Sequence, residues 1–283
     1  MMIDAHAHVI SGDKVRYVPA SPSGEIAPAD FDKPMDVEFL LREMDAAGVD
    51  KAVLVQRGSI YGFDNSYVCD SAARFPERLR AVGSIDPTRS DCAQQVERLA
   101  REGSAAGIRL MELVRGQGMG WLDSPGARGA WAAAAQLQVP VCVHFFPWNR
   151  AEGLARLRAI LGDIAGLTVV IDHFAAIRAE AGPPDHGVDE LLEGVAGFEG
   201  VTVKFTTIPL GRLHHAGIDA RPLVHRVRDL FGAERMMWGS DITQSPGTYG
   251  YMADLGREAV GGLSTGEQEQ LLGGTAARVY SMD

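Results

Sequence analysis

The chain has 283 residues, 46% of them hydrophobic, and a formal net charge of −10 at pH 7. This acidic balance argues against a general binder of nucleic acid or anionic membranes, whereas a small anionic substrate needs only a few local arginines. The length is close to that of one (β/α)8 barrel, and no apolar run approaches the ~20 residues of a membrane span.

Cysteine usage and the N-terminal sequence bear on the compartment. Cys69, Cys92 and Cys142 show no zinc-type spacing, and their odd number suits reduced thiols. The N-terminus lacks a charged region followed by an apolar one, so we expect no signal peptide and a cytoplasmic protein. A homo-oligomer is compatible with this composition.

Short β-type runs alternate with amphipathic helical patterns along the whole chain. The expected strands are Met2–His6, Lys51–Val55, Arg80–Ile85, Gly107–Met111, Val139–His144, Leu167–Asp172, Gly200–Phe205 and Arg235–Gly239. The expected helices are Asp36–Ala47, Asn65–Arg74, Asp91–Arg101, Gly126–Gln138, Glu152–Gly162, Val188–Ala196, Arg221–Phe231, Gly250–Val260 and Ser264–Tyr280. The last helix begins with a capping box formed by Ser264 and Glu267.

This alternation predicts parallel strands joined by helical crossovers. Eight units in fewer than 300 residues predict the α/β class and a single-domain TIM barrel over residues 1–283. An open doubly wound sheet is the main rival, but no G-x-G-x-x-G sequence follows the first strand. The aperiodic segment Ser11–Lys33 follows that strand and is either a substrate loop or a plain surface excursion.

Polar residues at the carboxyl ends of barrel strands indicate a catalytic site. His6 and His8 are two residues apart in the first strand and therefore share a face. His144 ends the fifth strand, His173 follows the sixth, and Asp241 follows the eighth. Imidazoles with a carboxylate suit Zn²⁺ or another borderline divalent ion, which leaves a position for water and lowers its pKa toward ~7.

Each of these residues also has a structural interpretation. His6 and His8 can be a solvated pair, His144 and His173 can be buried structural histidines, and Asp241 can cap a following turn. Asp172 precedes His173, and neighbours in a strand alternate faces. We therefore expect Asp172 to point away from His173, toward the helices.

Together these strand ends resemble the amidohydrolase superfamily, and more specifically its amidohydrolase-2 branch. Further matching segments are Val55-Gln56, Ile60-Tyr61-Gly62-Phe63-Asp64-Asn65, Gly107-Ile108-Arg109, Val170-Ile171-Asp172-His173 and Trp238-Gly239-Ser240-Asp241. They look most similar to the 2-pyrone-4,6-dicarboxylate lactonase-like and sugar-lactonase-like hydrolases. The resemblance covers essentially the whole chain and is specific for the branch, but it says little about the substrate.

The resemblance implies a set of roles at these positions. His6, His8, His144 and Asp241 would be metal ligands, Asp241 would also act as general base, and His173 would contact water or substrate. The fourth strand has no lysine for a bridging carbamate, so one divalent ion is expected, with Zn favoured over Mn. The pyrone-dicarboxylate lactonases work without a metal, so metal-free operation stays open.

The same resemblance singles out substrate-binding residues. Arg109 and Arg115 have the spacing of arginines that clamp carboxylates, a task that suits the bidentate guanidinium; otherwise one of them is solvated. The arginine that the family has after the sixth-strand histidine is missing, and Arg212 is either its replacement or a solvated side chain.

Three further residues belong to the same expectation. Tyr61 and Asn65 match the family stretch, although Asn65 can simply begin a helix. Trp148 either walls the pocket or packs in the core. His214 and His215 lie in what we expect to be a polar loop, where they are solvated or, as the lesser alternative, contact the substrate.

These residues predict a metal-dependent hydrolase that opens a lactone or related cyclic ester of a small, carboxylated substrate. One alternative is a metal-dependent, non-oxidative decarboxylase of an aromatic or unsaturated carboxylic acid, favoured by the stretch His144-Phe145-Phe146-Pro147-Trp148. A second alternative is a catalytically silent protein that binds a small molecule. Burying several ionisable groups without a use costs stability, which argues against this last alternative.

Overall fold

The computed structural model describes residues 1–22, 24, 35–101 and 105–282. One sheet of eight parallel strands follows the order of the chain. The strands are β1 (Ile3–Ala7), β2 (Lys51–Val55), β3 (Leu79–Ser84), β4 (Ala105–Met111), β5 (Val141–His144), β6 (Val169–Ile171), β7 (Val201–Thr206) and β8 (Met236–Gly239). The prediction of a TIM barrel is confirmed.

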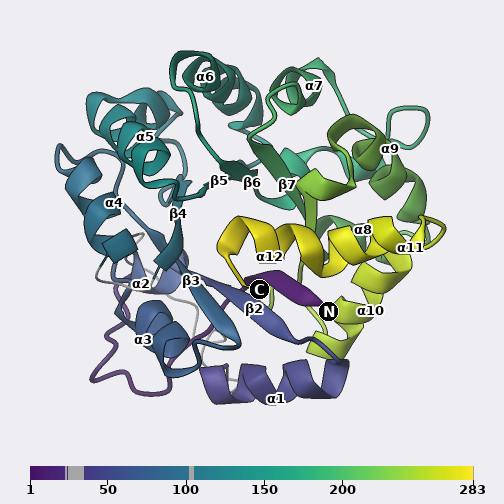
Figure 1. Cartoon of the computed structure of the whole chain (residues 1–283), viewed down its shortest axis with the longest axis horizontal. Helices are drawn as coiled ribbons and strands as arrows, with labels where there is room; N and C mark the ends of the chain where they lie inside the picture. Colours follow the sequence, from purple (N-terminus) through teal and green to yellow (C-terminus); the bar gives the residue numbers. More distant parts are fainter. Residues whose placement is uncertain (23, 25–34, 102–104, 283) are drawn as a thin grey trace.

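The ring is brought together between β8 and β1, which lie in contact. Just beyond β8, the backbone N–H of Asp241 donates to the carbonyl oxygen of His6 at 2.7 Å. Helices surround the strands (Figure 1). They are α1 (Val37–Ala47), α2 (Gly58–Tyr61), α3 (Ser66–Arg74), α4 (Cys92–Arg101), α5 (Pro125–Leu137), α6 (Arg150–Asp163), α7 (Glu190–Ala196), α8 (Thr207–His215), α9 (Arg221–Phe231), α10 (Tyr249–Ala259), α11 (Thr265–Glu269) and α12 (Thr275–Tyr280).

The strand side chains divide into two buried sets. One set packs against the helices, and the other fills the interior of the ring with small and branched residues such as Ala5, Val53 and Val170. Tyr280 and Ala276 of α12 join the inner set. Figure 1 shows α12 across the middle of the ring, near both termini. Because α12 closes the end where the strands begin, the opposite end is left for a site.

Three segments differ from the sequence prediction, and the first is α2, a short helix that was not expected. The expected helix Ser264–Tyr280 is divided by a π-helical turn at Gln270–Gly274, although its capping box at Ser264 is confirmed. The expected polar loop that contains His214 and His215 is instead the helix α8. Pro209 falls in the first turn of α8, where its missing N–H does no harm.

The long segment after β1 is only partly described. Within the described part, the backbone N–H of Ser11 donates to the Tyr61 hydroxyl at 2.8 Å. The remainder of Ser11–Lys33 lies outside the described residues, so its assignment as a substrate loop stays a prediction.

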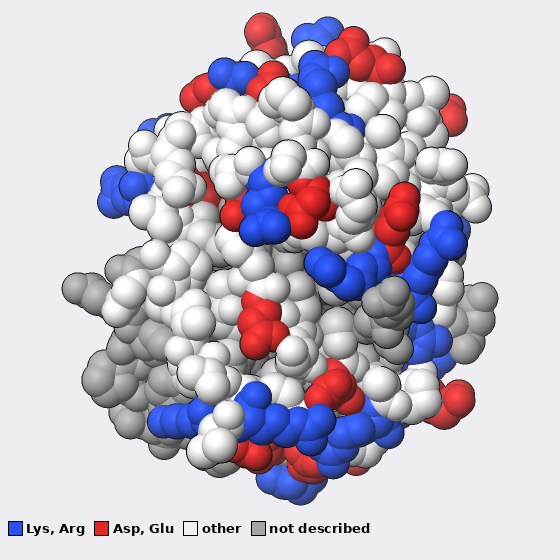
Figure 2. Space-filling view, turned by 90° about the vertical axis from the view of Figure 1, so that its left-hand side faces the viewer, with Lys and Arg blue, Asp and Glu red and all other residues white. Residues whose placement is uncertain are grey.

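Figure 2 shows acidic and basic side chains interspersed on one side of the molecule. Within the described ranges, no helix combines the length and the apolar character needed to cross a bilayer.

The closure between β1 and β8 depends on Gly239. A Cβ atom there would lie 2.5 Å from the Cβ of His6 and 2.9 Å from its backbone N. We therefore expect Gly239→Ala to force β8 away from β1 and to lower the free energy of unfolding by about 1–3 kcal/mol, measured by urea denaturation. Gly250→Ala is the matched control, since no atom lies within 4 Å of its added Cβ. Equal stability of the two variants would contradict this packing.

Candidate active site

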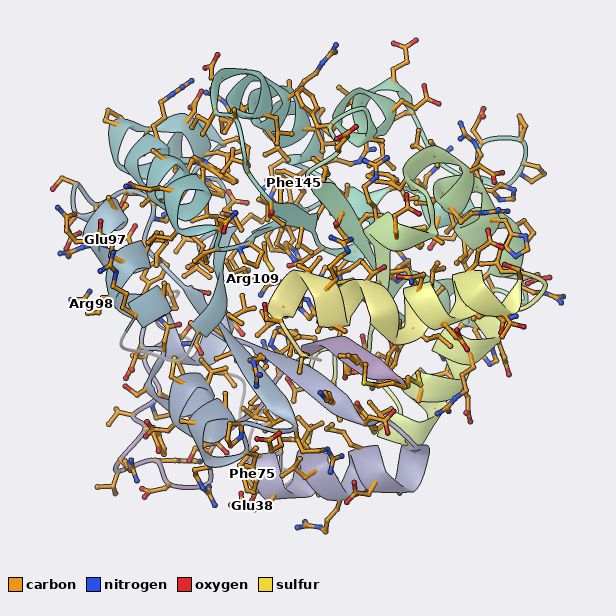
Figure 3. All side chains as sticks on the ribbon, viewed as in Figure 1. Glu38, Phe75, Glu97, Arg98, Arg109 and Phe145 are labelled. Carbon is orange, nitrogen blue, oxygen red and sulfur yellow. The ribbon has the colours of Figure 1, made fainter. Side chains whose placement is uncertain are left out.

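A cavity of about 350 Å³ opens at the carboxyl ends of the strands. Five of its polar residues come from different strand ends: His8, Arg109, His144, His173 and Asp241. Ser59, Glu112, Arg212 and Gln244 also line it. Its apolar wall is formed by Met111, Leu113, Phe145, Phe146, Ile208 and Pro209. Figure 3 shows Arg109 within the ring of strands, whereas Glu97 and Arg98 lie on the outer side of α4.

The ring of His8 is fixed by a backbone carbonyl group. Its Nδ1 lies 2.6 Å from the carbonyl oxygen of Val55 in β2. Because a carbonyl oxygen only accepts, Nδ1 carries the proton and Nε2 keeps its lone pair. This Nε2 lies 3.4 Å from Oδ1 of Asp241. A nitrogen lone pair and a carboxylate oxygen at this distance repel each other unless a cation lies between them.

His6 directs a second nitrogen at the same carboxylate oxygen. Its Nε2 is buried, lies 3.5 Å from Oδ1 of Asp241 and has no hydrogen-bond partner among the described residues. Ligand atoms 2.0–2.1 Å from a tetrahedral zinc ion are separated by about 3.4 Å. The two separations from Asp241 Oδ1 match this value, and the donor atoms of His6, His8 and Asp241 all lie within 4.8 Å of one another. This buried cluster suggests a divalent metal site.

A second group of possible donors shares His6. It consists of His6, Asp172 and His173. Its carboxylate already pairs with two cations, Arg109 and Lys204, so the group with Asp241 is the better metal site. His144, which the sequence suggested as a ligand, belongs to neither group within the described part of the chain.

Asp172 lies inside the barrel, and the expectation that it faces the helices was wrong. Arg109 donates to its Oδ2 from Nε at 3.0 Å, and Lys204 Nζ lies 3.2 Å from its Oδ1. Burial alone would raise the pKa of this carboxyl group, but Lys204, His6 and Arg109 together hold the pKa well below its usual range. Because side chains alternate between the two faces of a strand, Asp172 points to the interior, as Val170 does. His173, the next residue, departs from this alternation.

That departure is a left-handed turn. His173, Phe174, Ala175 and Ala176 all have φ between 51° and 54°, a conformation that costs about 1–2 kcal/mol for each residue with a Cβ. The turn brings His173 back over the cavity, where its Nδ1 lies 2.7 Å from the Thr206 hydroxyl. Strain of this kind concentrates at functional sites.

The four histidines are buried close together. Ring centroids of His6 and His8 are 4.9 Å apart, and those of His6 and His173 and of His144 and His173 are each 4.8 Å apart. Burial lowers the pKa of all four, that of His6 and His144 well below the ordinary value. The neutral imidazole is the form that binds metals.

Some of the predicted substrate-binding residues line the cavity, whereas others hold the surrounding loops and strands together. Arg212 lines the cavity and pairs with Glu180 at 2.9 Å. Tyr61 and Asn65 are not brought to this cavity. Tyr61 accepts from Ser11, while the Asn65 side chain bonds both the N–H and the carbonyl oxygen of Ser84 in β3.

Arg115 and Trp148 lie together at the rim. The Arg115 guanidinium sits 4.3 Å from the Trp148 ring centre, and Trp148 stacks on Phe146 with centroids 4.5 Å apart. Both side chains are well exposed, so the arginine is a rim residue and not an inner clamp.

Glu112, which directly follows β4 and lines the cavity, was not predicted from the sequence. It is buried and accepts from the backbone N–H of Gly116 and of Gln117, and from the side chains of Trp148 and Asn149. It thereby joins the loops that follow β4 and β5. A carboxylate immediately after a strand end was the available signal.

The Amidohydro_2 model, described as amidohydrolase, matches residues 3–282, and the chain belongs to this family. An L-fucono-1,5-lactonase from Burkholderia ambifaria is 27% identical over 296 residues, which cover 99% of this chain and 96% of that protein.

Solved structures share the fold at lower identity. An amidohydrolase from Burkholderia multivorans with bound zinc has a TM-score of 0.78 at 22% identity and full coverage of both chains. A probable 2-pyrone-4,6-dicarboxylic acid hydrolase from Acinetobacter baumannii with bound citric acid has a TM-score of 0.76 at 21% identity, with 99% of each chain covered. A 5-carboxyvanillate decarboxylase from Sphingomonas paucimobilis reaches 0.71 at 15% identity, covering 100% of this chain and 99% of that one.

The contribution of the buried ion pairs to stability can be tested by substituting Asp172. Asp172→Asn leaves Arg109 and Lys204 without their anion, so we expect the free energy of unfolding at pH 7 to fall by about 3–5 kcal/mol. Asp163→Asn, which removes an exposed ion pair with Arg128, should cost less than about 1 kcal/mol.

The pH dependence of this difference has a definite sign. Because the folded pKa of Asp172 is lowered, its contribution is complete above the ordinary value near ~3.9 and is lost as pH falls through the folded pKa. Urea titrations between pH 7 and pH 3 measure the difference in unfolding free energy between wild type and Asp172→Asn. This difference should become smaller only in the acidic range. A difference in unfolding free energy that stays constant down to pH 3 would contradict the lowered pKa of Asp172.

Proposed function

We propose that this protein is a metal-dependent hydrolase that opens a lactone or related cyclic ester of a small, carboxylated substrate. The observation that carries the proposal is the convergence of His6 Nε2, His8 Nε2 and Asp241 Oδ1 on one point beside a cavity. The similarity to a lactonase over nearly the whole chain supports this reaction class.

The proposed ligands are His6, His8 and Asp241, holding one divalent ion. Nitrogen-rich donor sets of this kind suit Zn²⁺ better than Mn²⁺, and zinc is bound in the similar amidohydrolase from Burkholderia multivorans. When bound, such an ion supplies Lewis acidity, because it polarises a carbonyl oxygen and makes water acidic near neutral pH.

The chain's own residues then carry the protons. Asp241 accepts a proton from the attacking water at Oδ2, the oxygen that already accepts from the Ser245 hydroxyl at 3.1 Å. Oxygen bonds to the lactone carbonyl carbon, and the ring C–O bond breaks. Asp241 returns the proton to the departing ring oxygen, so the product is an open hydroxy acid. His173 lines the same cavity and would donate to the carbonyl oxygen.

The cavity suits an anion on a largely apolar body, because the oxygens of the acidic lining residue Glu112 already accept from neighbouring N–H groups. Arg212 offers the guanidinium there, because Arg109 directs its Nε and Nη2 at Asp172 and His144. Arg115 stands further out, on the rim. Citric acid in the similar structure from Acinetobacter baumannii shows that a carboxylated molecule is accommodated by that protein.

A decarboxylase is the second candidate. The aromatic wall of Phe145 and Phe146 suits a planar ring, and the fold is shared with a 5-carboxyvanillate decarboxylase. In that reaction the ring carbon–carboxyl bond breaks, CO2 leaves, and Asp241 or His173 delivers a proton to carbon. Release of CO2 without uptake of water distinguishes it from lactone hydrolysis.

The proposed function is tested by metal removal. We expect purified protein to contain about one equivalent of zinc, to hydrolyse members of a carboxylated lactone panel, and to lose that activity on chelation and regain it with zinc. Asp241→Asn should reduce kcat by about 10²–10⁴-fold. Undiminished lactone hydrolysis by metal-free protein would refute the metal dependence.

The anion site is tested through Arg212. We expect Arg212→Gln to raise KM about tenfold for a carboxylated lactone and to leave KM unchanged for the corresponding neutral methyl ester. Arg226→Gln, which removes a surface arginine paired with Glu193 on the outside of the barrel, is the control. If both substrates respond alike, Arg212 does not recognise the carboxylate.

A further inference from the structure

His144 differs from His8 in the group that holds its ring. The Nδ1 of His144 lies 3.1 Å from Nη2 of Arg109. A guanidinium has donors only and stays protonated in proteins, so this Nδ1 must accept. A neutral imidazole that accepts at Nδ1 carries its proton at Nε2. The charged imidazolium is excluded here, because it would set one N–H against another.

The guanidinium cannot easily turn away from this contact. Its Nε and Nη2 lie 3.0 Å and 2.9 Å from Oδ2 of Asp172, and both side chains are buried. Asp172 is held in turn by Lys204 at 3.2 Å. The proton position on His144 is therefore set by an ion network inside the barrel.

The opposite arrangement at His8 shows what a ligand requires. There a carbonyl oxygen takes the Nδ1 proton and leaves Nε2 with a lone pair. At His144 the lone pair faces Arg109, and Nε2 carries hydrogen. His144 is also absent from both groups of possible metal donors among the described residues.

His6 Nδ1 lies 3.3 Å from Lys204 Nζ but also 3.3 Å from Asp172 Oδ1, and this carboxylate oxygen can accept the Nδ1 proton and leave a lone pair on Nε2. His144 Nδ1 lies 3.9 Å from Asp172 Oδ2, beyond hydrogen-bond distance, so Arg109 is its partner. The tautomer and the position of His144 thus both separate it from the ligand set.

We propose that His144 is a catalytic hydrogen-bond donor and not a metal ligand: its Nε2–H donates to the substrate carbonyl oxygen as negative charge develops there. His144 lines the cavity beside His173, with its ring 4.4 Å from that of Phe146. Donors of this kind stabilise the transition state more than the ground state. The identity of the acceptor rests on the proposed lactonase function, whereas the exclusion from the ligand set does not.

Metal affinity tests that exclusion without any substrate. Zinc is titrated against a chromophoric chelator with wild type, His144→Ala, His144→Gln and His8→Ala. We expect both His144 variants to bind one zinc within about threefold of wild-type affinity, while His8→Ala loses 100-fold or more. A loss in the His144 variants equal to that of His8→Ala would overturn the proposal.

The position of the proton on the His144 ring can be observed directly by NMR spectroscopy. ¹⁵N-histidine spectra of wild type, assigned by comparison with His144→Gln, should show His144 with Nε2 protonated and Nδ1 unprotonated, with and without zinc. The reverse tautomer in the zinc-loaded protein would overturn the proposal.

Kinetics test the catalytic part. His144→Ala should lower kcat on a hydrolysed lactone by about 10²–10³-fold, and His144→Gln, which retains an N–H donor, should recover at least tenfold. A wild-type kcat in His144→Ala would overturn the donor role. If wild type hydrolyses no lactone at all, the proposed function fails, and the zinc titration and the spectra still decide the state of His144.

Discussion

One buried carboxylate organises the centre of this barrel. Asp172 faces Arg109 from β4, Lys204 from β7 and His6 from β1, and burial without these partners would be costly for all of the charged groups. The network fixes the direction of the guanidinium and the position of the His6 ring. The chemistry at the cavity therefore depends on an ion cluster that makes little contact with solvent.

The two sides of the site differ in what they offer a reactant. On one side, the Val55 carbonyl group leaves His8 with a lone pair, and Asp241 and His6 complete a set of acceptors for a cation. On the other, Arg109 leaves His144 with a proton to donate. A carbonyl group placed between them would meet a Lewis acid and a hydrogen-bond donor, the combination that acyl transfer requires.

The regular part of the molecule was predictable from sequence, because it depends on local periodicity. All eight strands follow from apolar runs between amphipathic helices, and barrel topology then gathers His6, His8, His144, His173 and Asp241 at one end. The helix α8 was missed because proline and glycine within nine residues conceal its short apolar stripe. The place of Asp172 was missed because the left-handed turn at His173 breaks the alternation on which the prediction depended. Proton positions on imidazoles depend on contacts between distant strands, which no single segment encodes.

Anomalous diffraction at the zinc edge from zinc-loaded crystals would locate the ion and its ligands in one measurement. If His6, His8 and Asp241 hold one divalent ion while His144 stays outside the ligand set, one strong peak will be bonded to His6 Nε2, His8 Nε2 and Asp241, with Arg109 still bonded to His144 Nδ1. A peak ligated by His144, or no peak beside His6 and His8, would contradict this assignment of ligands.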